Sequence, residues 1–405
     1  MTGTAIKTNT YDNLLVILIA SLVFGYAGGA ALSPVNFIEL FFLPYLLSNR
    51  NLFRKKACVR LLFFSILWLS YSILSITWAS NINRGILTIF MYFFRFLMCF
   101  EMLVFSMRAN KPLESLSKGW FLAVILTSVI ALWEILTDHH LSIAREASLS
   151  TLSLDVQRAQ ASVLFYNPNT YCVFLVMAFP FLAYKLLSEK KKALTITVLL
   201  VLFFIVIKNA SRGAILSVGI MTLMLLLFFV KNKRFRGYGF VLLALLAVFF
   251  VLFGESLFSA FLFRMETQGM QDGARFEIWD GAWSTFLKSR GFGVGVGSMT
   301  KHLGALNSYG IEYAHCLLLE SLVEGGVILT ALVLFVLFRL LKLTVSVHQK
   351  TVRIVLWMAL ITFPVYSIIN SEYLRPAFVW SFFMSAFLYA LHKESAPQTP
   401  ALKNR

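Results

Sequence analysis

Residues 193–231 read ALTITVLLVLFFIVIKNASRGAILSVGIMTLMLLLFFVK, two apolar runs joined by a short polar connection. Each run is close to the length that an α-helix needs to cross about 30 Å of hydrocarbon. The connection contains Lys208 and Arg212, and it is too short to hide either charge. The stretch therefore predicts a hairpin of two membrane-spanning helices with a pair of cations at its tip.

The rest of the chain repeats this apolar pattern. Its 405 residues are 59% hydrophobic and 14% charged, with a mean hydropathy of +0.78, which excludes an ordinary soluble protein. We predict an all-α, polytopic integral membrane protein with about 12 transmembrane helices. The first run lacks a small-residue cleavage site, so we expect it to be a span and not a signal peptide. The predicted spans are 12–28, 33–49, 61–79, 85–107, 118–137, 169–187, 193–208, 211–231, 237–256, 315–338, 351–370 and 375–391.

Lysine and arginine are distributed unevenly between the two sides of this topology. Of the 36 residues, 24 fall on the side of both termini and 11 on the other, while Arg95 lies inside a span. Because cytoplasmic loops carry the basic excess, we predict that both termini are cytoplasmic. The net charge of +17 is then mostly a topology signal, with some attraction to the anionic lipid bilayer, and does not indicate a nucleic-acid partner.

One polar segment, residues 257–314, is much longer than the other connections. Long loops without linker composition are usually functional. We expect transmembrane helices 1–9 in residues 1–256, a periplasmic loop domain with short amphipathic helices in 257–314, and transmembrane helices 10–12 with a cytoplasmic tail in 315–405. The cytoplasmic loops contain no nucleotide-binding motif, so we place the chemistry on the outer, periplasmic side.

Cations on the outer side are candidates for binding a phosphate group. Guanidinium presents a planar fork of donors to phosphate oxygens, and at Arg212 the start of a helix adds its positive dipole end. Arg275 begins the pattern RFEIWDGAW, whose apolar spacing predicts an amphipathic helix at the membrane interface. Arg264 competes with Arg275 for this role, and Lys208 supports Arg212. The alternative for each cation is an ordinary interfacial anchor or flanking charge.

His315 begins the apolar run that follows the long loop. An imidazole accepts a proton near neutral pH, which suits a general base, although a lone histidine at a helix start is more often structural. Glu320 is a candidate to orient or compensate it, although a spacing of five residues is poor for a direct pair. Glu324 lies deeper in the run and requires a partner or a proton.

Two further motifs fit a site and ordinary structure equally well. Glycines alternate with Phe and Val in residues 291–297, as expected either for close approach of a ligand to the backbone or for flexibility. Asn167 and Asn169 flank a proline at a helix start, where their amides would bind sugar hydroxyls or only belong to the helix entry.

The sequence indicates neither a metal nor a cofactor. The four cysteines form no CxxC pair, and His139-His140 has no third ligand at a useful spacing. The intramembrane Arg95 is expected to pair with an acidic residue and to be structural. The candidate partners are Glu39, Glu101 and Glu134.

The polar motifs occur in a distinctive order along the chain. They are Phe165-Tyr-Asn-Pro-Asn169, Ser211-Arg-Gly213, Arg275 with Trp279, Gly293-Val-Gly-Val-Gly297, and His315 with Glu324-Gly-Gly326. From about residue 160 to 330, this order resembles the O-antigen ligase and Wzy-type polymerase superfamily of WaaL-like membrane glycosyltransferases. The first four spans match it only by general hydrophobicity. Cys316 follows the histidine where the family often has Asn or Ser, which puts one orienting hydrogen bond in doubt.

The resemblance implies a metal-independent, inverting glycosyltransferase at the periplasmic face of a bacterial inner membrane. Its donor would be a glycan on undecaprenyl diphosphate. The family's diphosphate-binding arginines match Arg212 and Arg275, and its catalytic histidine matches His315. The supporting residues would be Lys208, Arg264, Glu320, Asn167 and Asn169.

The acceptor separates two activities within this family. A ligase uses a hydroxyl of the lipid A-core, and a polymerase uses a second lipid-linked repeat unit. No residue in the sequence tells them apart; the family favours the ligase, with the polymerase as the alternative. A transporter of lipid-linked sugars is the alternative of a different class, although the chain shows no pair of matched halves.

Overall fold

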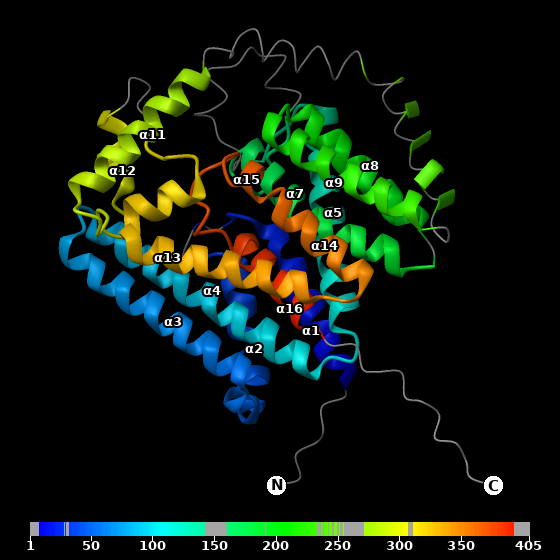
Figure 1. Ribbon diagram of the computed structural model, residues 1–405, viewed down its shortest axis with the longest axis horizontal. Coiled ribbons are helices and arrows are strands. Elements are labelled where there is room, and N and C mark those ends of the chain that lie inside the picture. Colours follow the sequence, from blue (N-terminus) through cyan, green and yellow to red (C-terminus); the bar gives the residue numbers. More distant parts are fainter. Residues whose placement is uncertain are drawn as a thin grey trace.

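The computed structural model is a bundle of helices of unequal length (Figure 1). It describes residues 8–27, 29, 32–141, 160–190, 192–232, 271–306 and 311–392, together with parts of 236–254. The α-helices whose full extent is described are α1 (Thr8–Ala20), α2 (Pro34–Ser48), α3 (Lys56–Ser75), α4 (Ile82–Arg108), α5 (Pro112–Thr137), α7 (Pro168–Ser188), α8 (Ala193–Lys208), α9 (Arg212–Lys231), α11 (Gln271–Lys288), α12 (Met299–Leu303), α13 (Leu317–Ser346), α14 (Lys350–Ile361), α15 (Phe363–Tyr366) and α16 (Ala377–Leu391).

Helix α7 forms the centre of the bundle. It packs against α5, α8, α9, α14 and α16, and nearly all of its side chains are buried. Aromatic rings fill the space around it: Trp120 of α5 stacks on Phe181 at 5.3 Å, and Phe165 lies 4.7 Å from Phe174. Such ring pairs add to the stabilisation that their buried area already supplies.

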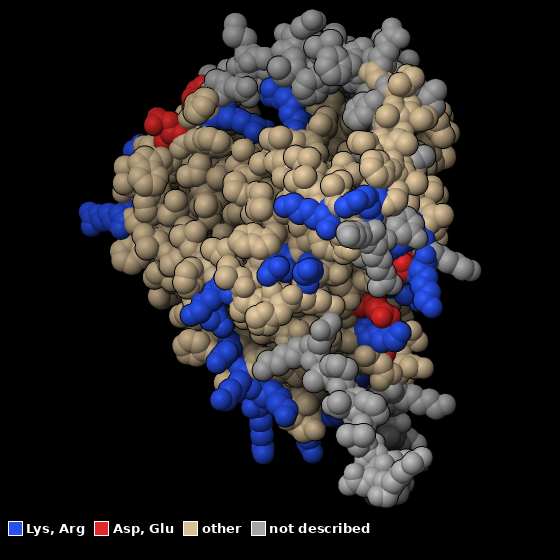
Figure 2. Space-filling view, turned by 45° about the vertical axis from the view of Figure 1, so that its right-hand side comes forward, with Lys and Arg blue, Asp and Glu red and all other residues tan. Residues whose placement is uncertain are grey.

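The described helices divide the molecule into two opposite ends. At the end that we call the basic face, Asp12 of α1 accepts hydrogen bonds from the Lys111 backbone and the Ser115 hydroxyl, and Tyr389 of α16 donates to Leu113. Exposed basic residues at the start of α3 lie at the same end. Figure 2 shows Lys and Arg side chains gathered toward the lower end of the molecule. The assignment of this face to the cytoplasm stays a prediction.

Among the described residues, six helices are long and apolar enough to cross a membrane: α3 with the turn that follows it, α4, α5, α7, α9 and α13. Four shorter apolar helices coincide with further predicted spans, namely Asn9–Phe24, Pro34–Ser48, Ala193–Lys208 and Ala377–Leu391. The predicted span 237–256 is described only in part. The all-helical, membrane-protein class is therefore supported, and the number of twelve spans stays a prediction.

The predicted span 351–370 is wrong in its second half. Helix α14 ends at Ile361, one short turn (α15) follows, and the backbone then runs irregularly to Pro376. Pro364 explains the break, because it has no N–H to donate to the Leu360 carbonyl and its ring crowds that carbonyl. The apolar pattern continued past the helix end because the irregular segment is itself buried; Tyr366, Ile369 and Tyr373 are at most 4% exposed.

The predicted span 315–338 also differs, because α13 continues to Ser346 and is broken at Gly326. Gly326 has φ 60° and ψ −157°, a conformation that is favourable only for glycine. Residues 291–297 pack into this break: Val294 N donates to Val323 O at 2.7 Å, and Val327 N donates to Gly291 O at 2.9 Å. The backbone of the long loop thus satisfies groups that the broken helix leaves open.

This interlock decides between the two interpretations of the alternating glycines. All four have positive φ, and a Cβ on Gly293 would lie 2.5 Å from Gly326 N. A Cβ on Gly297 would lie 2.6 Å from Gly85 N at the start of α4. The glycines therefore allow close approach between backbone segments; they are not simply flexible, and what they approach is the protein itself.

The predicted amphipathic helix after Arg275 is α11. Its Ile278 and Ala282 are buried against α13, whereas Phe276 is 69% and Trp283 49% exposed. A small separate core of Ala282, Met299, Leu303, Ala314 and Val323 joins α11, α12 and α13. The exposed aromatic side chains fit a helix that lies at a membrane interface.

Arg95 in α4 pairs with Glu39 of α2 at 3.4 Å and donates to Asn36 at 2.9 Å, as expected for a structural intramembrane charge. Glu134 has a different role, because it accepts the backbone N–H groups of Ser162 and Val163 at 2.9 Å. Among the described residues, both carboxylate oxygens of Glu101 are buried without a hydrogen-bond partner.

We predict that Gly293→Ala destabilises the protein by at least about 2 kcal/mol, because the new Cβ combines a left-handed backbone with a clash against Gly326. Thermal unfolding of the detergent-solubilised protein measures this. Gly219→Ala in α9 is the control: no atom lies within 4 Å of its Cβ position, so stability should be unchanged or slightly increased. Equal melting temperatures for Gly293→Ala and wild type would contradict the interlock.

Candidate functional site

Three of the residues predicted to form a site, Arg212, Arg275 and His315, lie in elements that contact the segment Ser367–Asn370, at the end of the bundle opposite the basic face. We call this segment the 367–370 segment and this end the site face. Arg275 of α11 donates to the Ile368 carbonyl at 3.2 Å, and the first N–H of α13, on Leu317, donates to the Ser367 carbonyl at 3.0 Å. Residues from three distant parts of the chain are thereby brought together.

His315 lies two residues before α13, in a left-handed backbone conformation with φ 48°. Histidine tolerates this region better than most residues, but it is uncommon enough to suggest a specific requirement. The indole of Trp279 donates to the Ala314 carbonyl at 2.9 Å, which ties the histidine turn to α11 one turn beyond Arg275. Cys316 is the N-cap of α13, and its thiol lies close to the backbone N–H groups of Leu318 and Leu319 without a regular cap hydrogen bond.

Arg212 is the first residue of α9, where the N-terminal end of a helix presents its backbone N–H groups. Its neighbour Gly213 packs on the 367–370 segment, since a Cβ there would lie 2.7 Å from the Ile369 side chain. The preceding Asn209 is buried and bonds both the N–H and the carbonyl of Ala161, at 2.8 and 2.9 Å. The start of α9 is thus held in a fixed position beside the segment that Arg275 contacts.

The predicted supporting residues have different positions. Asn167 caps α7 by accepting from Thr170 N at 2.9 Å and lies 3.4 Å from Asn370, so it borders the 367–370 segment. Asn169 lies half-buried in the first turn of the same helix. Lys208 places its ammonium 5.9 Å from the centre of the Phe204 ring. Arg264 lies outside the described residues.

Glu320 does not support His315 in the way that we expected. Its carboxylate accepts the backbone N–H of Tyr373 at 3.2 Å and so holds the connection between α15 and α16. Glu324, which required a partner, lies 3.6 Å from the guanidinium of Arg375. Both acidic residues of α13 therefore position the irregular segment that begins at Ser367.

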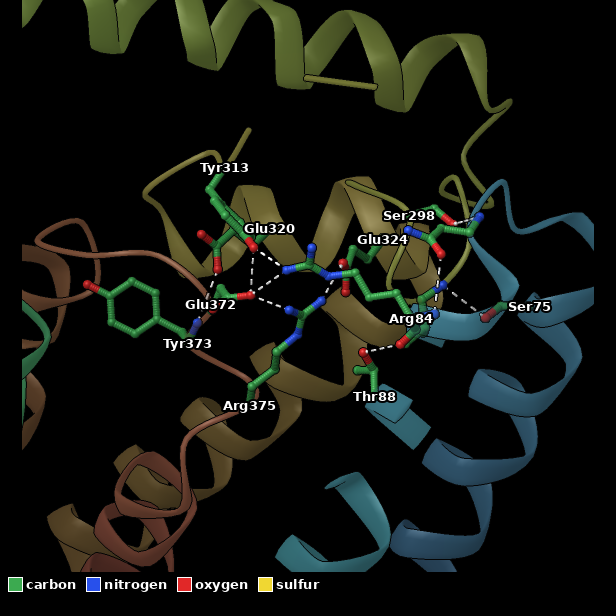
Figure 3. Close-up of polar contacts among 12 residues, drawn as sticks. Ser75, Arg84, Thr88, Ser298, Tyr313, Glu320, Glu324, Glu372, Tyr373 and Arg375 are labelled. Carbon is green, nitrogen blue, oxygen red and sulfur yellow. Dashed lines mark hydrogen bonds and ion pairs between the residues drawn. The ribbon is translucent and has the colours of Figure 1, made fainter. Parts of the chain in front are cut away.

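A compensated cluster of charges occupies the neighbouring part of the site face (Figure 3). Glu372 accepts from Arg84 at 2.9 Å and from Tyr313 at 2.8 Å, and it also pairs with Arg375. Figure 3 shows both guanidinium groups converging on this one carboxylate. With Glu324 included, two positive and two negative charges are present, so this cluster is a structural clamp and not an open anion site.

No local sequence pattern indicates the clamp. Arg84 and Glu372 are 288 residues apart, and each looked like an ordinary loop charge. The backbone conformation does mark this end of the molecule. Among the described residues, the non-glycine positions with positive φ are Asp138, Val163, Tyr166, Ala210, Arg290, His315 and Glu372. All of them lie in turns at helix ends on the site face, where the structure concentrates backbone strain.

An apolar groove leads away from the site face between α3, α4, α13 and α16. Its volume is about 770 Å³, and its lining is almost entirely aliphatic and aromatic. Leu317 and Leu374 line the end next to His315 and the clamp, while Arg60 and Arg339 line the other end. Exposed side chains such as Phe63 and Phe335 border it, so it opens on the flank of the bundle.

Within the described residues, no group of three or more His, Cys, Asp or Glu side chains is arranged to hold a metal ion. At His139-His140, the His139 Nδ1 lies 2.7 Å from the Thr137 carbonyl, a local contact that ends α5.

The comparison with known families bears on this geometry directly. Residues 196–334 match the family model described as O-antigen ligase. This stretch of the chain is similar to the O-antigen ligase family. Arg212, Arg275 and His315 all fall within the matched residues, which confirms the resemblance to the family. Over 350 residues the chain is also 24% identical to the "Teichuronic acid biosynthesis protein TuaE" of Bacillus subtilis (strain 168), covering 80% of this chain and 69% of that protein.

The electrostatics of the site face keep His315 uncharged. Burial, and then the positive charge of Arg275, lower the pKa of His315 to about 4. Its value in the unfolded chain is about 6.5, so folding favours the neutral imidazole. The linked stability is complete above about pH 6.5 and is lost as the pH falls toward 4, because the unfolded chain then binds more protons.

We predict that His315 titrates with a midpoint near pH 4 in the folded protein. Acylation of its imidazole by diethyl pyrocarbonate, followed over pH by mass spectrometry of the peptide, measures this, since only the neutral ring reacts. Arg275→Gln should move the midpoint upward, though not fully to about 6.5, because burial remains. A wild-type midpoint near 6.5, unchanged in Arg275→Gln, would show that His315 is neither buried nor close to Arg275.

Proposed function

We propose that this protein transfers a glycan from a polyprenyl diphosphate to an acceptor hydroxyl at the outer, periplasmic face of the inner membrane. The observation that carries the proposal is the meeting of Arg212, Arg275 and His315 around the 367–370 segment, next to the end of an apolar groove. The match of residues 196–334 to the O-antigen ligase family supports the same reaction class. No cofactor or nucleotide is required, because a sugar diphosphate already contains a good leaving group.

In the proposed reaction, the acceptor hydroxyl attacks the anomeric carbon of the donor sugar. The new C–O bond forms as the bond from that carbon to the diphosphate oxygen breaks, which inverts the anomeric configuration. His315 takes the hydroxyl proton, and the bonding electron pair leaves with the polyprenyl diphosphate. Arg212 and Arg275 stabilise the negative charge that grows on the departing diphosphate, the kind of stabilisation that is usually the largest in such catalysis.

The low pKa of His315 fits this role once the donor is considered. A pKa of about 4 makes a neutral imidazole that is always ready to accept a proton but is a weak base. Arg275 is one cause of that low value. A diphosphate bound at Arg275 would offset its positive charge and so raise the basicity of His315. Donor binding would thereby activate the base only when a substrate is present.

The apolar groove is the proposed position of the polyprenyl chain. It follows α13 from Leu317 to Leu343, about 40 Å of helix, which is enough to cross the hydrocarbon core. Its lateral opening would let a lipid enter from the bilayer without crossing the polar site face. Its outer end, at Leu317 and Leu374, lies where the diphosphate would have to be.

The acceptor remains the choice between a ligase and a polymerase. The family description favours a ligase that transfers to the lipid A-core. The similarity to a protein named for teichuronic acid biosynthesis favours the polymerase alternative, with a lipid-linked repeat unit as the acceptor. Transfer in vitro, with core lipid and lipid-linked repeat unit offered together, would distinguish them by which one is extended.

We predict that His315→Ala lowers transfer by about 10²- to 10⁴-fold in proteoliposomes supplied with donor and acceptor, while binding of the lipid-linked donor is retained. Arg212→Lys keeps the charge but loses the planar fork, and should slow transfer by about tenfold or more. His348→Ala, an exposed histidine next to α14, is the matched control and should behave as wild type. Undiminished transfer by His315→Ala would show that His315 is not the general base. If this variant transfers the glycan normally but fails to move the lipid-linked sugar across the membrane, the transporter alternative is favoured.

Metal independence is also testable. We predict that EDTA leaves the transfer rate unchanged, because the two arginines provide the positive charge that a divalent cation would otherwise supply. The assay is the same proteoliposome transfer, with excess Mg²⁺ added back as a control. Strong inhibition that Mg²⁺ reverses would require a metal site, with His139-His140 the first place to search.

A further inference from the structure

A second cavity lies on the site face, apart from the groove and from the clamp. Its volume is about 740 Å³, and α11, the 291–297 segment and α12 form its walls together with residues 78–80. Its lining combines two aromatic rings, Trp78 and Phe292, with hydroxyl groups and with the cations Lys288 and Lys301. Among the described residues that line it, none is acidic.

The aromatic part of this cavity is rigid. The indole of Trp78 donates to the Gly293 carbonyl at 3.1 Å, and Tyr71 donates to the Phe292 carbonyl at 2.8 Å. The two rings meet edge to face with centroids 6.3 Å apart, and Phe292 is 58% exposed. An exposed ring that is held in place from behind offers a flat apolar surface to a ligand, as the C–H face of a sugar ring requires.

The polar part of the cavity is arranged around Ser80. Lys301 Nζ donates to the Ser80 carbonyl at 2.7 Å, and His302 Nε2 lies 3.1 Å from the Ser80 hydroxyl. Burial, and then the charge of Lys301, lower the pKa of His302, so this imidazole is neutral at pH 7 and can exchange hydrogen bonds with hydroxyl groups. Lys288 is exposed at the end of α11 and supplies a second positive charge.

The geometry points to a binding site for an acidic saccharide, formed by Trp78, Phe292, Lys288 and Lys301. Aromatic faces and hydroxyl partners suit a sugar ring, and two cations without an acidic neighbour in the lining suit its carboxylate. A phospholipid headgroup would use the cations but has no need of the ordered aromatic surface. Glu277 and Asp280 of α11 do not line the cavity.

This inference rests on the proposed function for its meaning, because it assigns the saccharide to the donor's glycan chain. Helix α11 connects the two sites: Arg275 lies near its beginning and Lys288 at its end, roughly 20 Å apart along the axis. A glycan whose diphosphate end is at Arg275 would therefore reach the cavity several sugars beyond the reacting carbon. The cavity would select for acidic repeat units without touching the bond that is transferred.

The test measures binding of free saccharides to the full chain in phosphatidylcholine nanodiscs. The probes are a hyaluronan hexasaccharide and its carboxyl-reduced form, which differ only in the charge of three sugars. We expect the acidic form to bind at least about tenfold more tightly. Lys288→Gln with Lys301→Gln should remove this preference, and Phe292→Ala should weaken both forms. Lys342→Gln, exposed near the other end of α13, is the matched control and should change neither.

Three results would overturn the inference: equal binding of the two forms, an acidic preference that survives the double lysine variant, or complete displacement of the saccharide by phosphatidylglycerol in the nanodisc. The last would identify a lipid headgroup as the occupant. His315→Ala should retain saccharide binding. If the protein shows no preference for the acidic saccharide but its transfer activity requires His315, this inference alone is refuted. If the preference is present but transfer does not require His315, the proposed function alone is refuted.

Discussion

The hydrogen bond from Leu317 N–H to the Ser367 carbonyl is the contact on which the site face depends. It caps α13 with the backbone of the 367–370 segment and so fixes the turn that contains His315. The same segment receives the guanidinium of Arg275 at Ile368 and packs at Ile369 on the start of α9. One buried, irregular stretch of four residues therefore determines the relative positions of three elements that are distant in sequence.

A segment of this kind needs support, because irregular backbone at the end of a membrane bundle exposes polar groups that must be satisfied. Asn370 contacts Thr170 at 2.6 Å, Glu320 accepts from Tyr373, and the clamp of Arg84, Glu372 and Arg375 closes the other side. Helix α13 contacts it through Leu317, and the glycine segment packs into the break of that helix. Strain in the turns of the site face is thus balanced by packing and ion pairs around it.

Much of the fold could be predicted from the sequence, because long apolar runs identify helices directly. The runs 193–208 and 211–231 match α8 and α9 to within one residue. The prediction failed where hydrophobicity continued without a helix, as after Pro364, since burial and helix formation are separate requirements. The order of the polar motifs and the distribution of basic residues also predicted that Arg212, Arg275 and His315 would lie on the same side of the membrane. The 367–370 segment and the partners of Glu372 could not be predicted, because contacts between residues hundreds of positions apart leave no local sequence pattern.

In the proposed reaction, the two arginines and the histidine act on a single lipid-linked diphosphate. A structure of the protein with a bound polyprenyl diphosphate tests this most directly. We expect phosphate oxygens within hydrogen-bonding distance of both Arg212 and Arg275, the isoprenoid chain in the groove along α13, and the His315 imidazole beside the diphosphate. A diphosphate bound instead at Arg84 and Arg375, or one that contacts neither Arg212 nor Arg275, would contradict it.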